Sequence, residues 1–147
     1  EDLKKMDFFN KDFNVVPFLQ RKTRFHNNKA VYLKNAKEKF NEIFEKIQTL
    51  EKTELRLYLI KNVKGLGLKE VSHLMRNIGY KDLAILDRHI LKNLLKHNAI
   101  NEIPKSLNSK RYLEIEENFK IFSKKVDIPM DELDLFFWSL ETGKVFK

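Results

Sequence analysis

The sequence predicts an all-α protein. Glycine and proline are scarce, with four and three among 147 residues, so few positions would break a helix. The apolar residues recur with helical spacing, and no segment shows the apolar-polar alternation of β-branched residues that is typical of a strand. Hydrophobic residues make up 42% of the chain and include twelve Phe, enough to fill a core. A chain of this length suits one compact domain or two small helical lobes.

The first predicted helix begins at Asn27 or Asn28, because either side chain can cap it. Its apolar stripe is spaced to bury one face and comprises Val31, Leu33, Phe40, Ile43, Phe44 and Ile47. Thr53 is predicted to cap a second helix, whose apolar positions are Leu55, Leu59 and Ile60.

The second helix is predicted to end at Gly65-Leu66-Gly67, and a third helix to run from about Leu68 to Ile78, where Gly79 stops it. The sequence therefore predicts a helix, a glycine hairpin and a helix within 53–78.

Asp87 is predicted to cap the next helix, 87–97, whose apolar positions are Ile90, Leu91, Leu94 and Leu95. A loop with Pro104 follows over 98–108. The C-terminal helices are predicted within 109–142, before a tail over 143–147.

The first C-terminal helix should bury Leu113, Ile115, Phe119 and Phe122. The second is predicted to open at Pro129 and to end at Gly143. It is too apolar to leave one face in water, since it carries Leu133, Leu135, Phe136, Phe137 and Trp138.

The charge balance favours a polyanionic partner. Lys and Arg number 29 against 21 Asp and Glu, which gives a net charge of +8. The chain has no Cys, which excludes disulfides, thiolate zinc sites and cysteine-held iron–sulfur clusters, and its four His lack metal-ligand spacing. We expect neither a cofactor nor a catalytic metal. No apolar run reaches the length of a membrane span and no signal peptide is evident, so we expect an intracellular protein without a membrane partner.

The turn at Gly65-Leu66-Gly67 is a candidate phosphate grip. Glycines allow a positive φ and let backbone amides approach a ligand, while Lys64 and the start of the next helix add positive charge. An ordinary glycine connection is the alternative. The preceding apolar helix, the anchoring residues Leu66 and Leu68, and the basic chain favour a DNA-binding helix–hairpin–helix unit.

Lys69 and Asp87 are the candidate catalytic residues. Lys69 lies in the first turn of a helix, where the dipole disfavours a cation, so the position indicates either phosphate attraction or a nucleophilic amine. His73 shares its face, for packing or phosphate contact. Asp87 can cap a helix and also stabilise positive charge on a sugar, and it could face the same cleft as Lys69.

Taken together, Lys64-Gly-Leu-Gly-x-Lys69 and Leu-Asp87-Arg-His resemble the helix–hairpin–helix–Gly/Pro–Asp superfamily of DNA glycosylases. The resemblance implies that Lys69 is a Schiff-base lysine and Asp87 the catalytic aspartate. Lys64 stands where many relatives have proline. The lack of Cys argues against the iron–sulfur branch, and the presence of Lys69 argues against members that use water as the nucleophile.

The segment from Asp134 to Lys147 resembles the second type of archaeal 8-oxoguanine DNA glycosylase, and the likeness extends back to Arg24-Phe25. It implies two helical lobes with a cleft, of which the N-terminal one is incomplete, and a base pocket with Phe25, Trp138 and Lys147. From the residues alone, Phe25 among cations suits base stacking or a basic loop. Trp138 suits core packing, and Lys147 suits a frayed end.

The resemblance thus implies a monomeric, DNA-associated enzyme of an archaeon or similar prokaryote that acts on duplexes carrying 8-oxoguanine or abasic sites. Lys69 would attack C1′ of the extruded nucleotide, and the Schiff base would permit β-elimination. Two alternatives stay open: a helix–hairpin–helix module that only binds DNA, and the same chemistry on oxidised pyrimidines.

Overall fold

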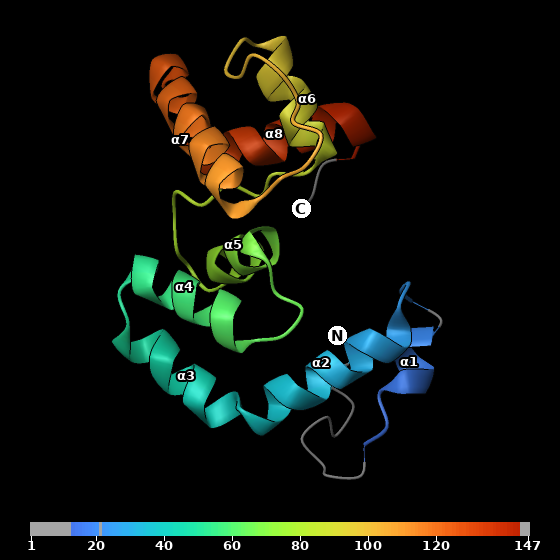
Figure 1. The fold of residues 1–147 in the computed structure, drawn as a ribbon. Helices are drawn as coiled ribbons and strands as arrows, with labels where there is room; N and C mark the ends of the chain where they lie inside the picture. Colours follow the sequence, from blue (N-terminus) through green and yellow to red (C-terminus); the bar gives the residue numbers. More distant parts are fainter. Residues whose placement is uncertain (1–12, 21, 145–147) are drawn as a thin grey trace. The chain divides into compact units, whose positions relative to one another are not determined.

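The computed structural model describes residues 13–20 and 22–144, which form helices and connections without a strand, so the all-α prediction is confirmed (Figure 1). The helices of these residues are α1 Val16–Gln20, α2 His26–Glu38, α3 Phe40–Thr49, α4 Lys52–Asn62, α5 Leu68–Asn77, α6 Arg88–Lys96, α7 Ser109–Val126 and α8 Met130–Thr142. They belong to two compact units that divide after Gly65, in agreement with the two predicted lobes. None of the described helices is both long and apolar enough to cross a bilayer.

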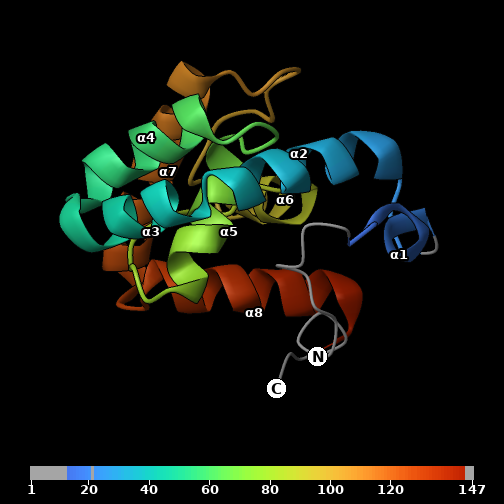
Figure 2. The same cartoon turned by 90° about the horizontal axis from the view of Figure 1, so that it is seen from below.

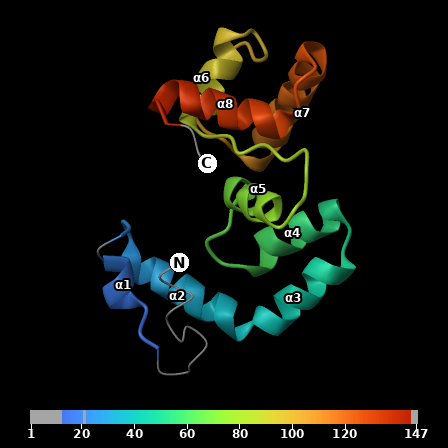
Figure 3. The same ribbon diagram turned by 180° about the vertical axis from the view of Figure 1, so that it is seen from behind.

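The first unit holds α1 to α4. α1 packs against α2 near the end where α2 begins (Figure 2). α2 and α3 follow one another with a break between them, and α4 returns alongside α3 (Figure 3). A bond from the Tyr58 hydroxyl to Oε1 of Glu42, 2.6 Å long, links α4 to α3. The other helices of this unit therefore support α4, after which the hairpin begins.

The prediction of one helix from Asn27 or Asn28 through Ile47 is wrong in two respects. The helix begins earlier, at His26, after Phe25 in the left-handed region, and neither Asn caps it because both lie in its first turn. It also breaks at Lys39, whose φ of −97° and ψ of 10° interrupt the helix. Val31, Phe40 and Phe44 of the predicted stripe are 45–56% exposed rather than buried.

The second predicted helix differs at its start. Glu51 is the N-cap of α4 and Thr53 lies inside the first turn, without a capping bond from either side chain. Leu55 and Leu59 are fully buried, as the spacing predicted. α5 begins at Leu68 and is followed by Gly79 with a φ of +105°, which is the glycine stop that the sequence indicated.

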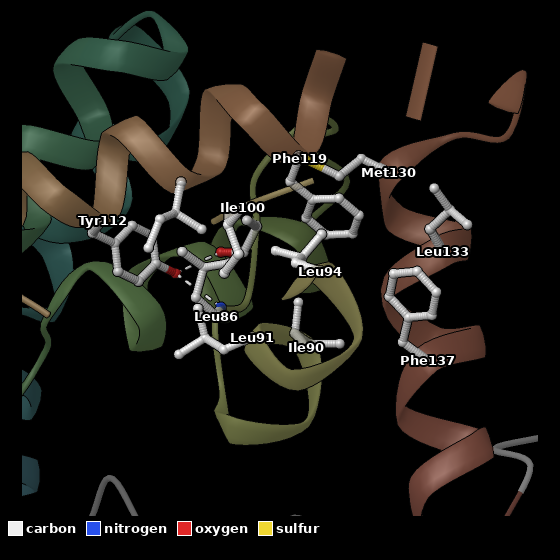
Figure 4. Packing of buried hydrophobic residues seen from close by; sticks show 12 residues of the cluster. Leu86, Ile90, Leu91, Leu94, Ile100, Tyr112, Phe119, Met130, Leu133 and Phe137 are labelled. Carbon is white, nitrogen blue, oxygen red and sulfur yellow. Dashed lines mark hydrogen bonds between the residues drawn. The ribbon is translucent and has the colours of Figure 1, made fainter. Parts of the chain in front are cut away.

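The second unit is built on α6, α7 and α8, with α8 packed against both of the others. Its core is one hydrophobic cluster (Figure 4), comprising Ala84, Leu86, Ile90, Leu91, Leu94, Ile100, Tyr112, Ile115, Phe119, Met130, Leu133 and Phe137. Leu68 at the start of α5 packs against this cluster. The core thus reaches both segments that carry the candidate catalytic residues.

Three apolar residues of the C-terminal helices that were predicted to be buried are exposed. On α7 the buried stripe contains Tyr112, Ile115 and Phe119, so Leu113 is displaced from it by about 100° and is 46% exposed. On α8 the stripe contains Met130, Leu133 and Phe137, which leaves Leu135 and Phe136 more than half exposed. Pro129 precedes α8 as its N-cap instead of opening it.

Candidate active site

The hairpin between α4 and α5 accepts only glycine at position 65. Gly65 has a φ of +87°, which L side chains rarely adopt, and a Cβ atom there would lie within 3.0 Å of the Tyr32 ring. Tyr32 belongs to α2 in the same unit, so α2 braces the turn by packing its ring against the bare backbone. The sequence predicted the positive φ but gave no indication of Tyr32.

At the start of α5, one of the backbone N–H groups already has a hydrogen-bond acceptor within the chain. The Gly67 N–H donates to Oε2 of Glu70 at 3.1 Å, which is half of a capping box. One of the hairpin amides predicted to hold a phosphate is therefore already bonded to a carboxylate. The spacing Gly67-x-x-Glu70 is the signal that could have revealed this cap.

Lys69 is the second residue of α5, and its side chain is exposed. No ion pair involving Lys69 occurs within residues 13–20 and 22–144, so no carboxylate there neutralises the amine at a helix start that disfavours a cation. Leu68, directly before it, is fixed against the core cluster. His73 is also exposed, one turn further along the helix.

Asp87 caps α6 as predicted. Its Oδ1 accepts hydrogen bonds from the His89 N–H at 2.8 Å and the Ile90 N–H at 2.9 Å. The residue before it, Leu86, belongs to the core cluster (Figure 4). Lys69 and Asp87 therefore each follow a leucine that is anchored by one core.

The segment Ala84–Leu86, which leads to Asp87, is held by side chains. The Ala84 N–H donates to Oε1 of Glu116 at 2.8 Å, and the Ala84 carbonyl accepts from the Tyr112 hydroxyl at 2.6 Å. The Leu86 N–H donates to the same hydroxyl at 3.3 Å, as the dashed lines of Figure 4 show. The sequence offers no signal for either side chain, because a Tyr and a Glu on a charged helix form no special pattern.

Asp134 holds the remaining amide of that segment. Its Oδ2 accepts the Ile85 N–H at 3.1 Å and Nη1 of Arg76 at 2.6 Å. Arg76 also donates from Nη2 to the Asp131 carbonyl at 3.0 Å. A carboxylate within an apolar run, Leu133-Asp134-Leu135, was the available sequence signal for a buried partner.

Opposing electrostatic effects act on the pKa of the Asp134 carboxyl. Burial raises the pKa of the Asp134 carboxyl, whereas the charge of Arg76 and the bond from Ile85 act to lower that pKa. The negative charge of Asp87 adds to the rise, which indicates that the two carboxylates are electrostatic neighbours. With Arg76 at 2.6 Å, we describe Asp134 as a buried ion-pair partner.

A second polar cluster joins α6 to α8. Glu141 lies 2.7 Å from Nζ of Lys92 and 3.9 Å from Nδ1 of His89. The hydrogen bond from Lys92 is the main cause that lowers the pKa of the Glu141 carboxyl. The cluster fixes the end of α8 against the helix that Asp87 caps.

The predicted base-pocket residues lie in different units. Phe25 belongs to the first unit, is 70% exposed, and has the Arg24 guanidinium 5.5 Å from its ring centroid. Trp138 belongs to α8 in the second unit and is half-buried. Lys147 lies outside the described residues, so the predicted pocket stays a prediction.

No group of three or more His, Asp or Glu side chains that could hold a metal ion occurs in the part of the chain that the structure describes.

Comparison with known proteins places this arrangement in a family. Residues 1–128 match the family model described as Ogg-HhH, 8-oxoguanine DNA glycosylase. The curated relatives named 8-oxoguanine DNA glycosylase/AP lyase include one from Methanocaldococcus jannaschii, 44% identical over 84% of this chain and 60% of that protein. Another, from Fusobacterium nucleatum, is 43% identical over 99% of this chain and 71% of that protein.

Among solved structures, the M. jannaschii 8-oxoguanine glycosylase/lyase in complex with a 15mer DNA containing 8-oxoguanine has a TM-score of 0.77 and 41% identity. The alignment covers 87% of this chain and 62% of that one. The chain thus spans about 60–70% of the length of these proteins. Because the family model matches residues 1–128, most of its length, the chain belongs to the Ogg-HhH family of 8-oxoguanine DNA glycosylases.

Proposed function

We propose that the chain excises 8-oxoguanine from DNA and cleaves the strand at the resulting abasic site. The observation that carries the proposal is the placement of Lys69 and Asp87 at the starts of α5 and α6, each directly after a leucine held by the same core cluster. Family membership supports the substrate class, because relatives of this chain are named 8-oxoguanine DNA glycosylase/AP lyase.

In this mechanism the Lys69 amine attacks C1′ of the extruded nucleotide as the bond from C1′ to the base breaks. Asp87 stabilises the positive charge that develops on the sugar, using a carboxylate that its two cap bonds hold in place. The sugar ring opens to give a Schiff base with Lys69. Loss of a C2′ proton then expels the 3′ phosphate, which leaves the strand cleaved.

The DNA backbone would be gripped by 64–68. Lys64 would supply a charge, and the amides of the turn and of the start of α5 would donate hydrogen bonds to phosphate oxygens. The Gly67 N–H is shared with Glu70, so this grip relies on the neighbouring amides or on movement of the Glu70 carboxylate. Phe25, Trp138 and Lys147 are proposed to contact the extruded base.

The proposed partner is double-stranded DNA that carries 8-oxoguanine or an abasic site, bound by a monomer inside the cell. Three findings support DNA as the partner: the net charge of +8, the hairpin, and a structural relative that was crystallised with lesion DNA. The narrower prediction of an archaeal or similar prokaryotic source is kept as a proposal.

The test is borohydride trapping with duplexes that contain 8-oxoguanine. The wild-type chain should form a covalent complex, and Lys69→Gln should abolish both the complex and strand cleavage while DNA binding stays within about threefold. Lys110→Gln is the matched control, because Lys110 is also the second residue of its helix and is exposed. It removes the same charge and should trap normally.

The outcomes separate the alternatives. Binding without trapping by the wild-type chain would favour a DNA-binding module. Trapping that is stronger on duplexes with an oxidised pyrimidine would favour the other lesion class. Retained trapping in Lys69→Gln would refute the assignment of the nucleophile.

A further inference from the structure

The segment Ala84–Leu86 lacks a helical or strand partner for its amides, yet each of its three N–H groups is bonded to a side chain. Glu116 and Tyr112 come from α7, and Asp134 comes from α8. Tyr112 additionally donates to the Ala84 carbonyl, and its ring is buried in the core (Figure 4). We call these three side chains the 84–86 clamp.

Among the side chains of the 84–86 clamp, Asp134 is the one whose burial is hardest to explain by stability alone. It lies on the buried stripe of α8, one turn from Met130 and close to Phe137, and is only 6% exposed. A buried ion pair is rarely a better source of stability than apolar residues of similar volume. A carboxylate at such a position therefore points to a role beyond holding the core together.

The contacts of Asp134 connect the two candidate catalytic segments. Its Oδ2 is shared between Ile85, two residues before Asp87, and Arg76, in the last turn of the helix that begins beside Lys69. Arg76 is in turn held by the Asp131 carbonyl, so Asp134 has little freedom to move. All of these residues belong to the second unit.

We propose that Tyr112 and Asp134 are positioning residues that hold the backbone before Asp87, and thereby its carboxylate, in the orientation needed for base release. The proposal rests on the proposed function. Oδ1 of Asp87 is used by the cap, and Oδ2 makes no hydrogen bond within the described part of the chain, so only one oxygen is available to the sugar. Its direction is set by the backbone that the clamp fixes.

The charge of Asp134 also has to be balanced. The negative charge of Asp87 adds to the rise in the pKa of the Asp134 carboxyl, and the charge of Arg76, 2.6 Å away, acts to lower that pKa. The other charged group on the pair is Asp131, 3.3 Å from Nε of Arg76. Arg76 therefore balances the charge of the buried carboxylate that bonds the segment.

The first test compares base release with cleavage of a preformed abasic site. Asp134→Ala and, independently, Tyr112→Phe should slow single-turnover release of 8-oxoguanine by about tenfold or more, because a small misplacement of a catalytic group has a large effect on rate. Trapping on abasic DNA needs Lys69 and should change by about twofold or less. Asp134→Asn keeps an acceptor for Ile85 and should recover part of the loss.

A double-mutant cycle shows whether these residues act through Asp87. In an Asp87→Asn background, adding Tyr112→Phe or Asp134→Ala should slow base release by about twofold at most. The same factor in both backgrounds would overturn the proposal. The matched control is Asp131→Asn, which removes the other acidic partner of Arg76 but no bond to the 84–86 segment.

Hydrogen exchange gives a readout that does not depend on activity. Loss of the clamp should speed exchange of the His89 and Ile90 amides, which Asp87 caps, by about fivefold or more. The Arg111 amide, capped by Asn108, is the internal reference and should not change. Unchanged exchange at His89 and Ile90 in both variants would overturn the proposal even in an active enzyme. Faster exchange in a chain that never traps DNA would count against the proposed function alone.

Discussion

At the scale of single residues, Asp87 combines two requirements that are usually separate. An N-cap needs a short acceptor side chain with extended backbone, and Asp87 has a φ of −105° and a ψ of −179°. A group that stabilises an oxocarbenium-like sugar needs a fixed negative charge. The two cap bonds to one oxygen hold the carboxylate rigid, so the structural role supports the proposed catalytic one.

Replacing Asp87 with Asn separates these roles. Asn caps almost as well as Asp, so the free energy of unfolding should fall by only about 0.5 kcal/mol. Base release should slow by roughly 10²-fold, because the charge is lost. Single-turnover kinetics and denaturant unfolding check both values. Near-normal excision would leave Asp87 with the cap alone, and Asp87→Ala, which removes cap and charge together, serves as the comparison.

At the scale of elements, the hairpin depends on a contact that neither of its helices supplies. Gly65→Ala would strain a backbone with a φ of +87° and push a methyl group into the Tyr32 ring. We expect a loss of about 1–3 kcal/mol in the free energy of unfolding together with weaker DNA binding.

Gly79→Ala is the matched control, because Gly79 has a φ of +105° but nothing within 4 Å of an added Cβ. Both variants carry the backbone strain, so a larger effect at Gly65 measures the contact with Tyr32. Combining Gly65→Ala with Tyr32→Ala should relieve only the steric part. Equal losses in the free energy of unfolding for Gly65→Ala and Gly79→Ala would show that the Tyr32 ring moves aside without destabilising the fold.

The connection between α6 and α8 should make stability depend on pH. The Lys92 hydrogen bond lowers the folded-state pKa of Glu141 below its ordinary value of 4.5. A depressed carboxyl pKa stabilises the fold above the unfolded-state pKa, and this stabilisation is lost as the pH falls through the folded-state value. In thermal unfolding, wild type should exceed Glu141→Gln in Tm at pH 6 to 7, and the difference should shrink below about pH 4.5. A constant difference across that range would contradict the interpretation.

At the scale of the whole molecule, the net charge of +8 should dominate DNA affinity. The logarithm of the binding constant should fall linearly with the logarithm of salt concentration, as counterions are released from phosphates. Lys64→Gln should reduce the magnitude of that slope by about one, because it removes one proposed phosphate contact. Lys105→Gln changes the same charge in the 98–108 loop, where no DNA contact is proposed, and should leave the slope nearly unchanged.

Several features of the fold could be predicted because they depend on local chemistry. The glycine stops at Gly79 and Gly143, the Asp87 cap and the start of α5 all follow from a residue and its immediate neighbours. The break at Lys39 could not be predicted in this way, since no glycine or proline marks it. Nor could the exposure of Leu113, because choosing between adjacent apolar positions requires knowing which side of α7 faces the core.

The sequence by itself determined that the chain is helical, that its hairpin needs glycine, and that Lys69 and Asp87 are the residues to examine. Periodicity, turn conformation and residue spacing are properties of a short stretch of chain, so they can be recognised without knowledge of the fold. Only the tertiary structure decided that Tyr32 braces Gly65 and that Tyr112, Glu116 and Asp134 hold the segment before Asp87. These contacts join residues 26 to 49 positions apart, and side-chain contacts at such separations depend on how helices pack rather than on any local pattern.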